Sequence, residues 1–329
     1  MPRRRSLLAT SFALAASSAA RAQEDFPSRS LRLVLPFTPG GAVDLTGRLL
    51  AELLAPVLGQ AVAVENRGGA AGNLGGDSVA RAAKDGYSLL LGSATLLAAN
   101  KFLFPKTMPF DPLVDLAPVS RVAGGTLLLV VNADRPWRSF AELVAAAKQK
   151  PGRIVMGSSG TGSVSQLMLA ALNRAAGIEI AHLPYRGGAA AIQDLRAGGI
   201  DMMFDVIPAL MPPVRAGRFR PLAVASAGRV TFVPELRDVP GMAELLPGAG
   251  IDMRTWYAVM ATGGTPEDRL AILHRAVRQV VRAEPFRARL EPLGFTPVSD
   301  ASPGDCLDYL RAQEGVWKDL VDMAGATQD

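Results

Sequence analysis

The chain has 329 residues, with 35 lysines and arginines against 30 aspartates and glutamates and a formal net charge of +5. Residues 1–22 hold four of the arginines and no acidic residue, so residues 23–329 are nearly neutral, with 31 basic and 30 acidic side chains. Because no basic cluster with interleaved aromatic residues follows, nucleic acid and anionic membrane surfaces are excluded as expected partners.

The first 22 residues have the pattern of a secretory signal peptide. Three arginines at positions 3–5 precede a short apolar run, and an A-x-A cleavage site ends at Ala22. We therefore predict a periplasmic protein that is cleaved near Ala22, and both Sec and twin-arginine export fit the pattern. The length of the mature chain suggests two domains. Cys306 is the single cysteine of the chain, which leaves no intramolecular disulfide.

Strand and helix patterns alternate from Leu31 onward, in two units separated by a loop that contains Pro105, Pro109, Pro112 and Pro118. The C-terminal third adds too few strands for a third domain and is expected to pack on the first unit. Such alternation predicts an α/β protein with doubly wound parallel sheets covered on both faces. The expected strands are 31–37, 61–66, 87–93, 126–133, 153–159, 180–185, 201–206, 221–226 and 252–261, and the expected helices are 42–58, 73–83, 139–149, 163–176, 188–197, 266–282 and 304–324.

The stretch LRLVLPFTPGGAVDLTGRLL, residues 31–50, predicts a strand that opens through glycines into a helix. Glycines allow backbone N–H groups to approach a ligand, and a helix N-terminus carries about half a positive charge, so this junction suits an anion. No lysine follows, and neither the phosphate-loop motif nor the dinucleotide fingerprint is present. A carboxylate fits better than a phosphate, and a simple tight turn is the alternative.

A second junction of the same kind lies at residues 153–172, RIVMGSSGTGSVSQLMLAAL, in the other unit. Ligands of doubly wound sheets bind beyond the carboxyl ends of the strands, so two such junctions facing each other would hold one small acid from both sides. Asp205 ends the expected strand 201–206 at the same edge, where it could cap a loop or orient a water or a ligand hydroxyl.

Residues for catalysis are scarce. His182 and His274 are the two histidines, and neither has metal-ligand spacing; His274 is expected on a helix surface and His182 near the cleft. The sequence GTGSV around Ser163 does not reproduce the G-x-S-x-G elbow of serine hydrolases. Cys306 is interpreted as structural, and the glycines of NRGGAAGNLGG are a weak cofactor signal without a lysine. We therefore expect no enzyme, no cofactor and no metal site.

Eight segments resemble, in order and spacing, the Bug-type solute receptors, the substrate-binding proteins of tripartite tricarboxylate transporters. The resemblance covers essentially all of the mature chain. It implies a type II periplasmic binding fold, in which two α/β domains joined by two crossing strands close over a small carboxylated metabolite and deliver it to a membrane permease. The eight segments are LVLPFTPGGAVD, VENRGGAAGNLG, DGYSLLLGS, VVNADRP, GSSGTGSVSQL, LPYRGGAAAIQDL, MMFDVIP and PELRDVPGM.

The resemblance also implies how the acid is held, mainly by backbone amides, hydroxyls and bridging waters. This sequence departs from the family pattern at three positions: the family often has His at Gln166, Asn at Val206, and Pro or a small residue at Thr38. The implied ligand-binding residues are Phe37, Thr38, Pro39, Gly40, Gly41, Asp44, Ser93, Ser158, Thr161, Gly162, Ser163, Gln166, Gly187, Gly188, Ala189 and Asp205.

The implied domains are residues 23–125 with 228–329, and residues 126–227. The expected ligand is a mono- or dicarboxylate, an amino acid or an aromatic acid, bound by a monomer that serves a membrane permease. Two alternatives stay open: an exported sensor that presents the ligand to a signalling partner, and a secreted α/β enzyme that acts on a small acid.

Overall fold

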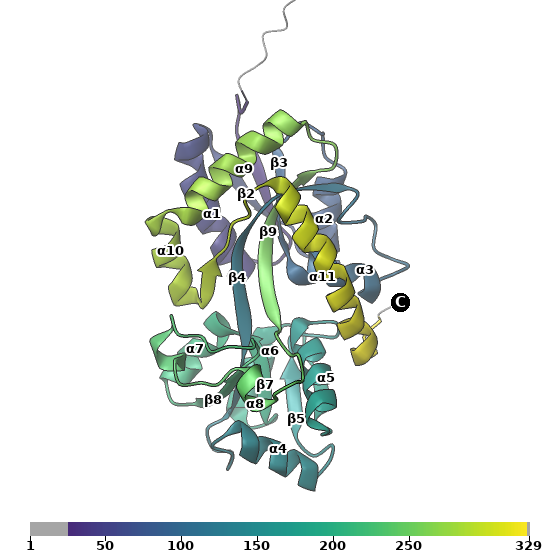
Figure 1. Ribbon diagram of the computed structural model, residues 1–329, viewed down its shortest axis with the longest axis vertical. Helices are drawn as coiled ribbons and strands as arrows, with labels where there is room; N and C mark the ends of the chain where they lie inside the picture. The colour runs from purple at the N-terminus through teal and green to yellow at the C-terminus, as the bar shows by residue number, and fades with distance from the viewer. Residues whose placement is uncertain (1–25, 328–329) are drawn as a thin grey trace, which may run out of the picture.

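The computed structural model describes residues 26–327, which form two α/β lobes stacked along the long axis of the molecule (Figure 1). In the first lobe, three parallel strands lie beside an antiparallel strand, because β1 pairs with β2 and β3, and β3 pairs with β9 in the opposite direction. The elements are β1 (Leu31–Leu35), β2 (Val62–Asn66), β3 (Ser88–Ser93), β9 (Arg254–Thr262) and β10 (Phe295–Pro297), with helices α1 (Ala42–Leu58), α2 (Asn73–Ala80), α9 (Glu267–Arg282) and α10 (Glu284–Leu290).

The second lobe repeats the plan with β5 and β7 parallel, and β6 parallel to β5. One face of its sheet packs against α6 and α7, where Leu195, Ile207 and Leu210 are buried against Leu128 and Met203. The elements are β5 (Val155–Ser158), β6 (Ala181–Pro184), β7 (Met202–Val206) and β8 (Phe219–Val224), with helices α4 (Phe140–Gln149), α5 (Val164–Ala176), α6 (Gly188–Ala197), α7 (Ile207–Arg215) and α8 (Met242–Leu245).

Strand β4 (Leu116–Asn132) belongs to both lobes. Residues 116–126 pair antiparallel with β9, and residues 127–132 pair antiparallel with β7 and β8. β4 and β9 thus run side by side between the lobes (Figure 1). The expected start at residue 126 and the placing of Pro118 in a loop were wrong, because β4 accommodates Pro118 through register shifts before and after Arg121. The sheets are mixed rather than parallel, because β4 and β9 pair antiparallel with their neighbours.

Helix α11 (Pro303–Ala324) also reaches both lobes. It packs on β4 and on the helical turn at Thr95–Ala99, and on α5 of the second lobe. Trp317 and Leu310 are buried in a core cluster that contains Leu90 of the first lobe and Leu167 of the second. The C-terminal third therefore returns only partly to the first lobe as expected, since α9 and α10 pack there while α11 bridges the two.

A segment between β8 and β9 packs on the second lobe. Val230, Val233, Leu236 and Val239 lie in the same cluster as Leu210 of α7. The residue limits of the two domains stay a prediction. Within residues 26–327 the helices are all too short or too polar to cross a membrane.

Candidate functional site

The first junction forms as a strand, a loop and an uncapped helix. Pro36 is buried, and residues 38–41 are exposed, with Gly40 at φ +90. Gly41 stands at the N-cap of α1, where no side chain accepts from the first turn. The leading amides of a 17-residue helix therefore lack a side-chain cap and provide donors with the positive end of the helix dipole behind them.

Asp44 fixes the shape of this loop. Its buried carboxylate accepts hydrogen bonds from the Gly40 amide at 2.9 Å, from Arg48 Nε at 3.0 Å and from Asn66 Nδ2 at 2.8 Å. Burial alone would raise the pKa of Asp44, but the bonds from Arg48, Gly40 and Asn66 outweigh burial and lower it. Asn66, which the sequence did not single out, also donates to the Phe37 carbonyl at 3.1 Å. Asp44 is thus occupied in holding the loop.

Glycines within residues 68–76 pack against Pro36 and Phe37 at the start of the loop. A Cβ at Gly75 would lie 2.8 Å from Pro36 Cα, so only glycine allows this approach. Gly72 packs near Phe37 with φ +94, a backbone conformation that favours glycine. Ser93 ends β3 beside them, where its buried hydroxyl accepts from the Leu96 amide at 3.3 Å. These glycines therefore have a packing role.

At the second junction, the hydroxyl groups of Ser158 and Ser163 form hydrogen bonds within the second lobe itself. Ser158 is fully buried; its Oγ donates to the Gly160 carbonyl at 3.1 Å and lies 2.7 Å from His182 Nε2. Burial lowers the pKa of His182, which favours the neutral ring. Ser163 is the N-cap of α5 and accepts from the Gln166 amide at 3.4 Å, while Gln166 Oε1 accepts from the Gly162 amide at 2.6 Å. Thr161 is exposed at the tip.

A third group lies at the end of β7 and the start of α6. The Asp205 carboxylate accepts from the Val206 amide at 2.7 Å, and a Cβ at Gly188 would lie 2.4 Å from Asp205 Oδ2. Gly187, with φ +106, leads into the helix, and Ala189 is exposed in its first turn. Burial raises the pKa of Asp205 to about 6, because the charged form loses hydration.

The loops of the two lobes meet through two residues that the sequence did not mark. A Cβ at Gly162 would lie 3.1 Å from Cδ2 of Leu103, which ends α3 (Asn100–Leu103) in the first lobe. The second residue is Tyr257 of β9, whose pKa is raised by burial and, to a smaller extent, by the charge of Asp205. The structure thus gathers the predicted residues in three groups, one in the first lobe and two in the second.

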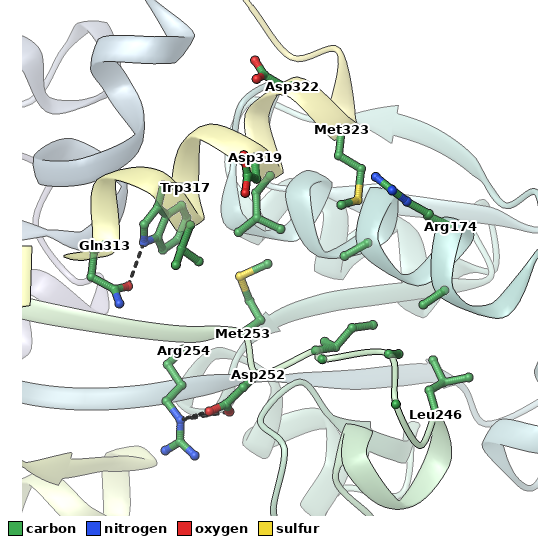
Figure 2. A pocket seen from close by; sticks show the side chains of 18 of the residues that line it. Arg174, Leu246, Asp252, Met253, Arg254, Gln313, Trp317, Asp319, Asp322 and Met323 are labelled. Carbon is green, nitrogen blue, oxygen red and sulfur yellow. Dashed lines mark hydrogen bonds and ion pairs between the residues drawn. The ribbon is translucent and has the colours of Figure 1, made fainter. Parts of the chain in front are cut away.

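A large groove lies elsewhere, among α5, α11 and the segment before β9. It measures about 1530 Å³ and contains none of the predicted site residues. Figure 2 shows Trp317 with its indole donating to Gln313 on one wall, and Arg254 paired with Asp252 on another. The groove is lined by residues 171, 174–175, 245–254, 309, 313, 316–317, 319–320 and 322–323.

Comparison with known proteins decides the family. The model of the tripartite tricarboxylate transporter family receptor matches residues 46–325. The chain belongs to this receptor family. A protein of Pseudomonas sp. (strain P51), described as a UPF0065 protein in the tcbD-tcbE intergenic region, is 36% identical over 321 residues, 97% of this chain and 94% of the relative. BugT of Bordetella pertussis is 34% identical, with 92% and 91% of the two chains covered.

Solved structures agree with this receptor's fold. The periplasmic binding protein BugD superposes with a TM-score of 0.79 at 30% identity, over 92% of this chain and 100% of BugD. An R. palustris protein solved with adipate gives 0.83 at 33% identity, over 92% and 99%, and MatC from Rhodopseudomonas palustris with bound malate gives 0.78 at 30%, over 90% and 100%. The predicted two-domain type II binding fold is therefore confirmed, and the family is one of periplasmic receptors. The predicted signal peptide lies outside the described residues.

Two remaining residues have ordinary structural positions in the receptor. His274 is buried on α9, with Nδ1 2.8 Å from the Val119 carbonyl and Nε2 3.1 Å from the Ala301 carbonyl, so its expected surface position was wrong. Cys306 is buried in the core, as its structural interpretation predicted. Among residues 26–327, no three His, Cys, Asp or Glu side chains lie close enough to hold a metal ion.

Proposed function

We propose that this receptor captures a small carboxylated metabolite between its two lobes and delivers it to a membrane permease of the tripartite tricarboxylate type. The observation that supports this proposal is the pair of glycine-rich helix starts, one in each lobe, on the sides where Leu103 meets Gly162. Helix N-termini and free amides bind carboxylates without a cation. We propose no cofactor and a monomeric protein.

Within the proposed ligand-binding set, the donors differ in availability. Thr38, Gly41, Thr161 and Ala189 are exposed and can meet the acid. The Gly40 amide is already bonded to Asp44, and Asp44, Ser158 and Gln166 are engaged in holding their loops. The proposed set is Phe37, Thr38, Pro39, Gly40, Gly41, Asp44, Ser93, Ser158, Thr161, Gly162, Ser163, Gln166, Gly187, Gly188, Ala189 and Asp205.

Two donor groups on opposite lobes favour a ligand with an acid group at each end. Two relatives of similar fold were solved with adipate and malate, which are both dicarboxylates. Among the acids expected from the sequence, we therefore propose a dicarboxylate. An enzymatic role receives no support from the one serine next to a histidine, because the Ser158 side chain is fully buried and already bonded to Gly160.

Calorimetry on residues 23–329 with adipate, malate, monocarboxylates, amino acids and aromatic acids tests the proposal. We expect one dicarboxylate to bind at a 1:1 ratio, with equal affinity in the presence of a chelator, and to compact the protein in small-angle scattering. Failure of the whole panel, or binding that a chelator abolishes, would contradict it.

Gly41→Leu tests the first junction. Because φ at Gly41 is −81 and its Cβ would meet no atom within 4 Å, a leucine is compatible with the fold but fills the space in front of the α1 amides. We expect an unchanged melting temperature and an affinity at least about tenfold weaker, a loss of roughly 1.4 kcal/mol. The matched control is Arg186→Gln, which removes an exposed cation beside the second junction and should cost less. Unchanged affinity of Gly41→Leu would make the junction a simple turn.

A further inference from the structure

The proposed site contains two aspartates with opposite surroundings. Asp44 receives three kinds of donor, including the Arg48 guanidinium. Asp205 receives one hydrogen bond, from the amide of the next residue, and takes part in no ion pair with a described residue. A receptor for anions thus places a carboxyl group that pairs with no described cationic side chain at the end of β7, beside the start of α6.

Within residues 26–327, no Lys, Arg or His side chain forms a hydrogen bond or ion pair with Asp205. Leu128 of β4 is its cross-strand partner, and Gly188 of α6 leaves the space into which Oδ2 extends. The Met203 methyl group lies close by, since a Cβ at Gly188 would be 3.8 Å from it. The charge of Asp205 also raises the pKa of the Tyr257 phenol of β9, which burial keeps neutral. The carboxyl group therefore lies at the end of β7 and the start of α6 among apolar and neutral groups.

We propose that Asp205 meets the ligand as the neutral acid and donates its proton in a hydrogen bond to a ligand carboxylate, so that capture of the ligand takes up one proton. This inference rests on the proposed function, because it requires a carboxylate in this site. The balance is simple: solvent supplies the proton to Asp205, and no covalent bond changes in the ligand. The physical reason is that two carboxylates in contact cannot both stay ionised in a site of low polarity.

Affinity should then depend on pH in a defined range. Asp205 of the free protein titrates at a pKa of about 6, and a bound carboxylate raises that value further. Between the two values the free protein is ionised and the complex is protonated, so each added pH unit should weaken binding by up to about tenfold. The first carboxyl group of an aliphatic dicarboxylic acid titrates near pH 4 and the second about one pH unit higher, so both are largely ionised above about pH 6.

The test uses the dicarboxylate that the calorimetric panel identifies, with adipate and malate as the first probes, and measures affinity from pH 6 to 8 in buffers of different ionisation enthalpy. Three proteins are compared: the wild type, the Asp205→Asn variant and the Asp319→Asn variant. Asparagine is neutral at every pH and keeps a donor in place of the protonated acid, whereas Asp319 is an exposed aspartate on α11 outside the site. Melting temperatures show whether each variant is folded.

We expect the wild type and Asp319→Asn to take up about one proton per ligand and to lose affinity as pH rises, and we expect Asp205→Asn to bind with a nearly flat pH profile. A flat wild-type profile without proton uptake would overturn the inference. If the wild-type profile is flat and Asp205→Asn binds at least about tenfold more weakly than the wild type, Asp205 acts instead as an ionised acceptor for a donor group of the ligand. If no carboxylate binds to the wild type at any pH, the proposed function fails instead.

Discussion

Asp44 Oδ2 accepts a hydrogen bond from the Gly40 amide at 2.9 Å, so a residue inside helix α1 determines the shape of the loop before it. This relationship makes Asp44 part of the fold of the first junction. The same carboxylate satisfies Asn66 and Arg48, which come from β2 and from the next turn of α1.

Asp44→Ala should lower the free energy of unfolding by about 1–3 kcal/mol, because it removes the buried carboxylate that accepts hydrogen bonds from the Gly40 amide, Arg48 and Asn66. Since the pKa of Asp44 is lowered in the native protein, its contribution is present above pH 4 and is lost as pH falls through the native pKa. Urea unfolding at pH 7 and pH 3 measures both effects. Asp77→Ala, which breaks a surface pair with Arg81 on α2, should cost less than about 1 kcal/mol. Equal losses in the two variants would contradict the assignment.

Ser163→Ala should weaken ligand binding by about tenfold or less and lower stability by ~1 kcal/mol, because the hydroxyl is the N-cap of α5 at the proposed site. Ser139→Ala removes the equivalent cap of α4, where the hydroxyl accepts from the Glu142 amide at 3.2 Å, far from the site in sequence and on another helix. Calorimetry with thermal unfolding separates the two roles. The control should lose similar stability and no affinity; a parallel loss of affinity in Ser139→Ala would reduce the Ser163 effect to general destabilisation.

Gly188→Ala should reduce both stability and affinity, because the new Cβ would lie 2.4 Å from Asp205 Oδ2. Overpacking of this kind costs about 1–3 kcal/mol. Gly315→Ala is the matched control, since Gly315 lies within α11 and its Cβ would meet no atom within 4 Å. The control should gain up to ~1 kcal/mol from helix propensity. Chemical unfolding of both variants measures the difference, and a stable Gly188→Ala with full affinity would show that Asp205 has room to move aside.

Asp205→Asn should stabilise the ligand-free protein at pH 8 more than at pH 5. The native pKa of about 6 lies above the unfolded value near 4, so the native state binds the proton more tightly. The cost of the buried charge is therefore absent below pH 4, grows as pH rises to 6 and is complete above it, reaching up to ~3 kcal/mol. Urea midpoints of both proteins from pH 5 to 8 measure this cost. A constant difference across this range would mean that Asp205 titrates as an exposed aspartate.

Helices with a glycine at each end could be predicted from the local sequence. Helices α1 and α6 begin and end at the predicted residues, because Gly41 and Gly187 precede them and Gly59 and Gly198 follow in the left-handed conformation that ends a helix. The predicted strand was shorter than β4, because Pro118 is typical of a loop and only pairing with the distant strand β9 makes it part of a strand. α7 was missed for a similar reason, since it contains Pro212 and Pro213 near its C-terminal end.

The site was predictable only in part. Glycine-rich junctions are visible in the sequence, and they fall where strands end in each lobe. Asn66, Leu103 and Tyr257 carry no local signal, because their roles depend on which strand or helix lies opposite them in the fold. The error at His274 has the same origin: its two carbonyl partners come from β4 and from the segment before α11, far away in sequence.

Because helix α11 packs against both lobes, a fluorescent label on it should respond to their relative movement. Val316 is 51% exposed on the wall of the large groove, whereas the chain's single cysteine, Cys306, is buried. Val316→Cys would therefore provide one accessible thiol for an environment-sensitive dye, outside the residues proposed to touch the ligand. Such a labelled protein would report lobe closure as a change in emission and would turn the receptor into an optical sensor for its own metabolite.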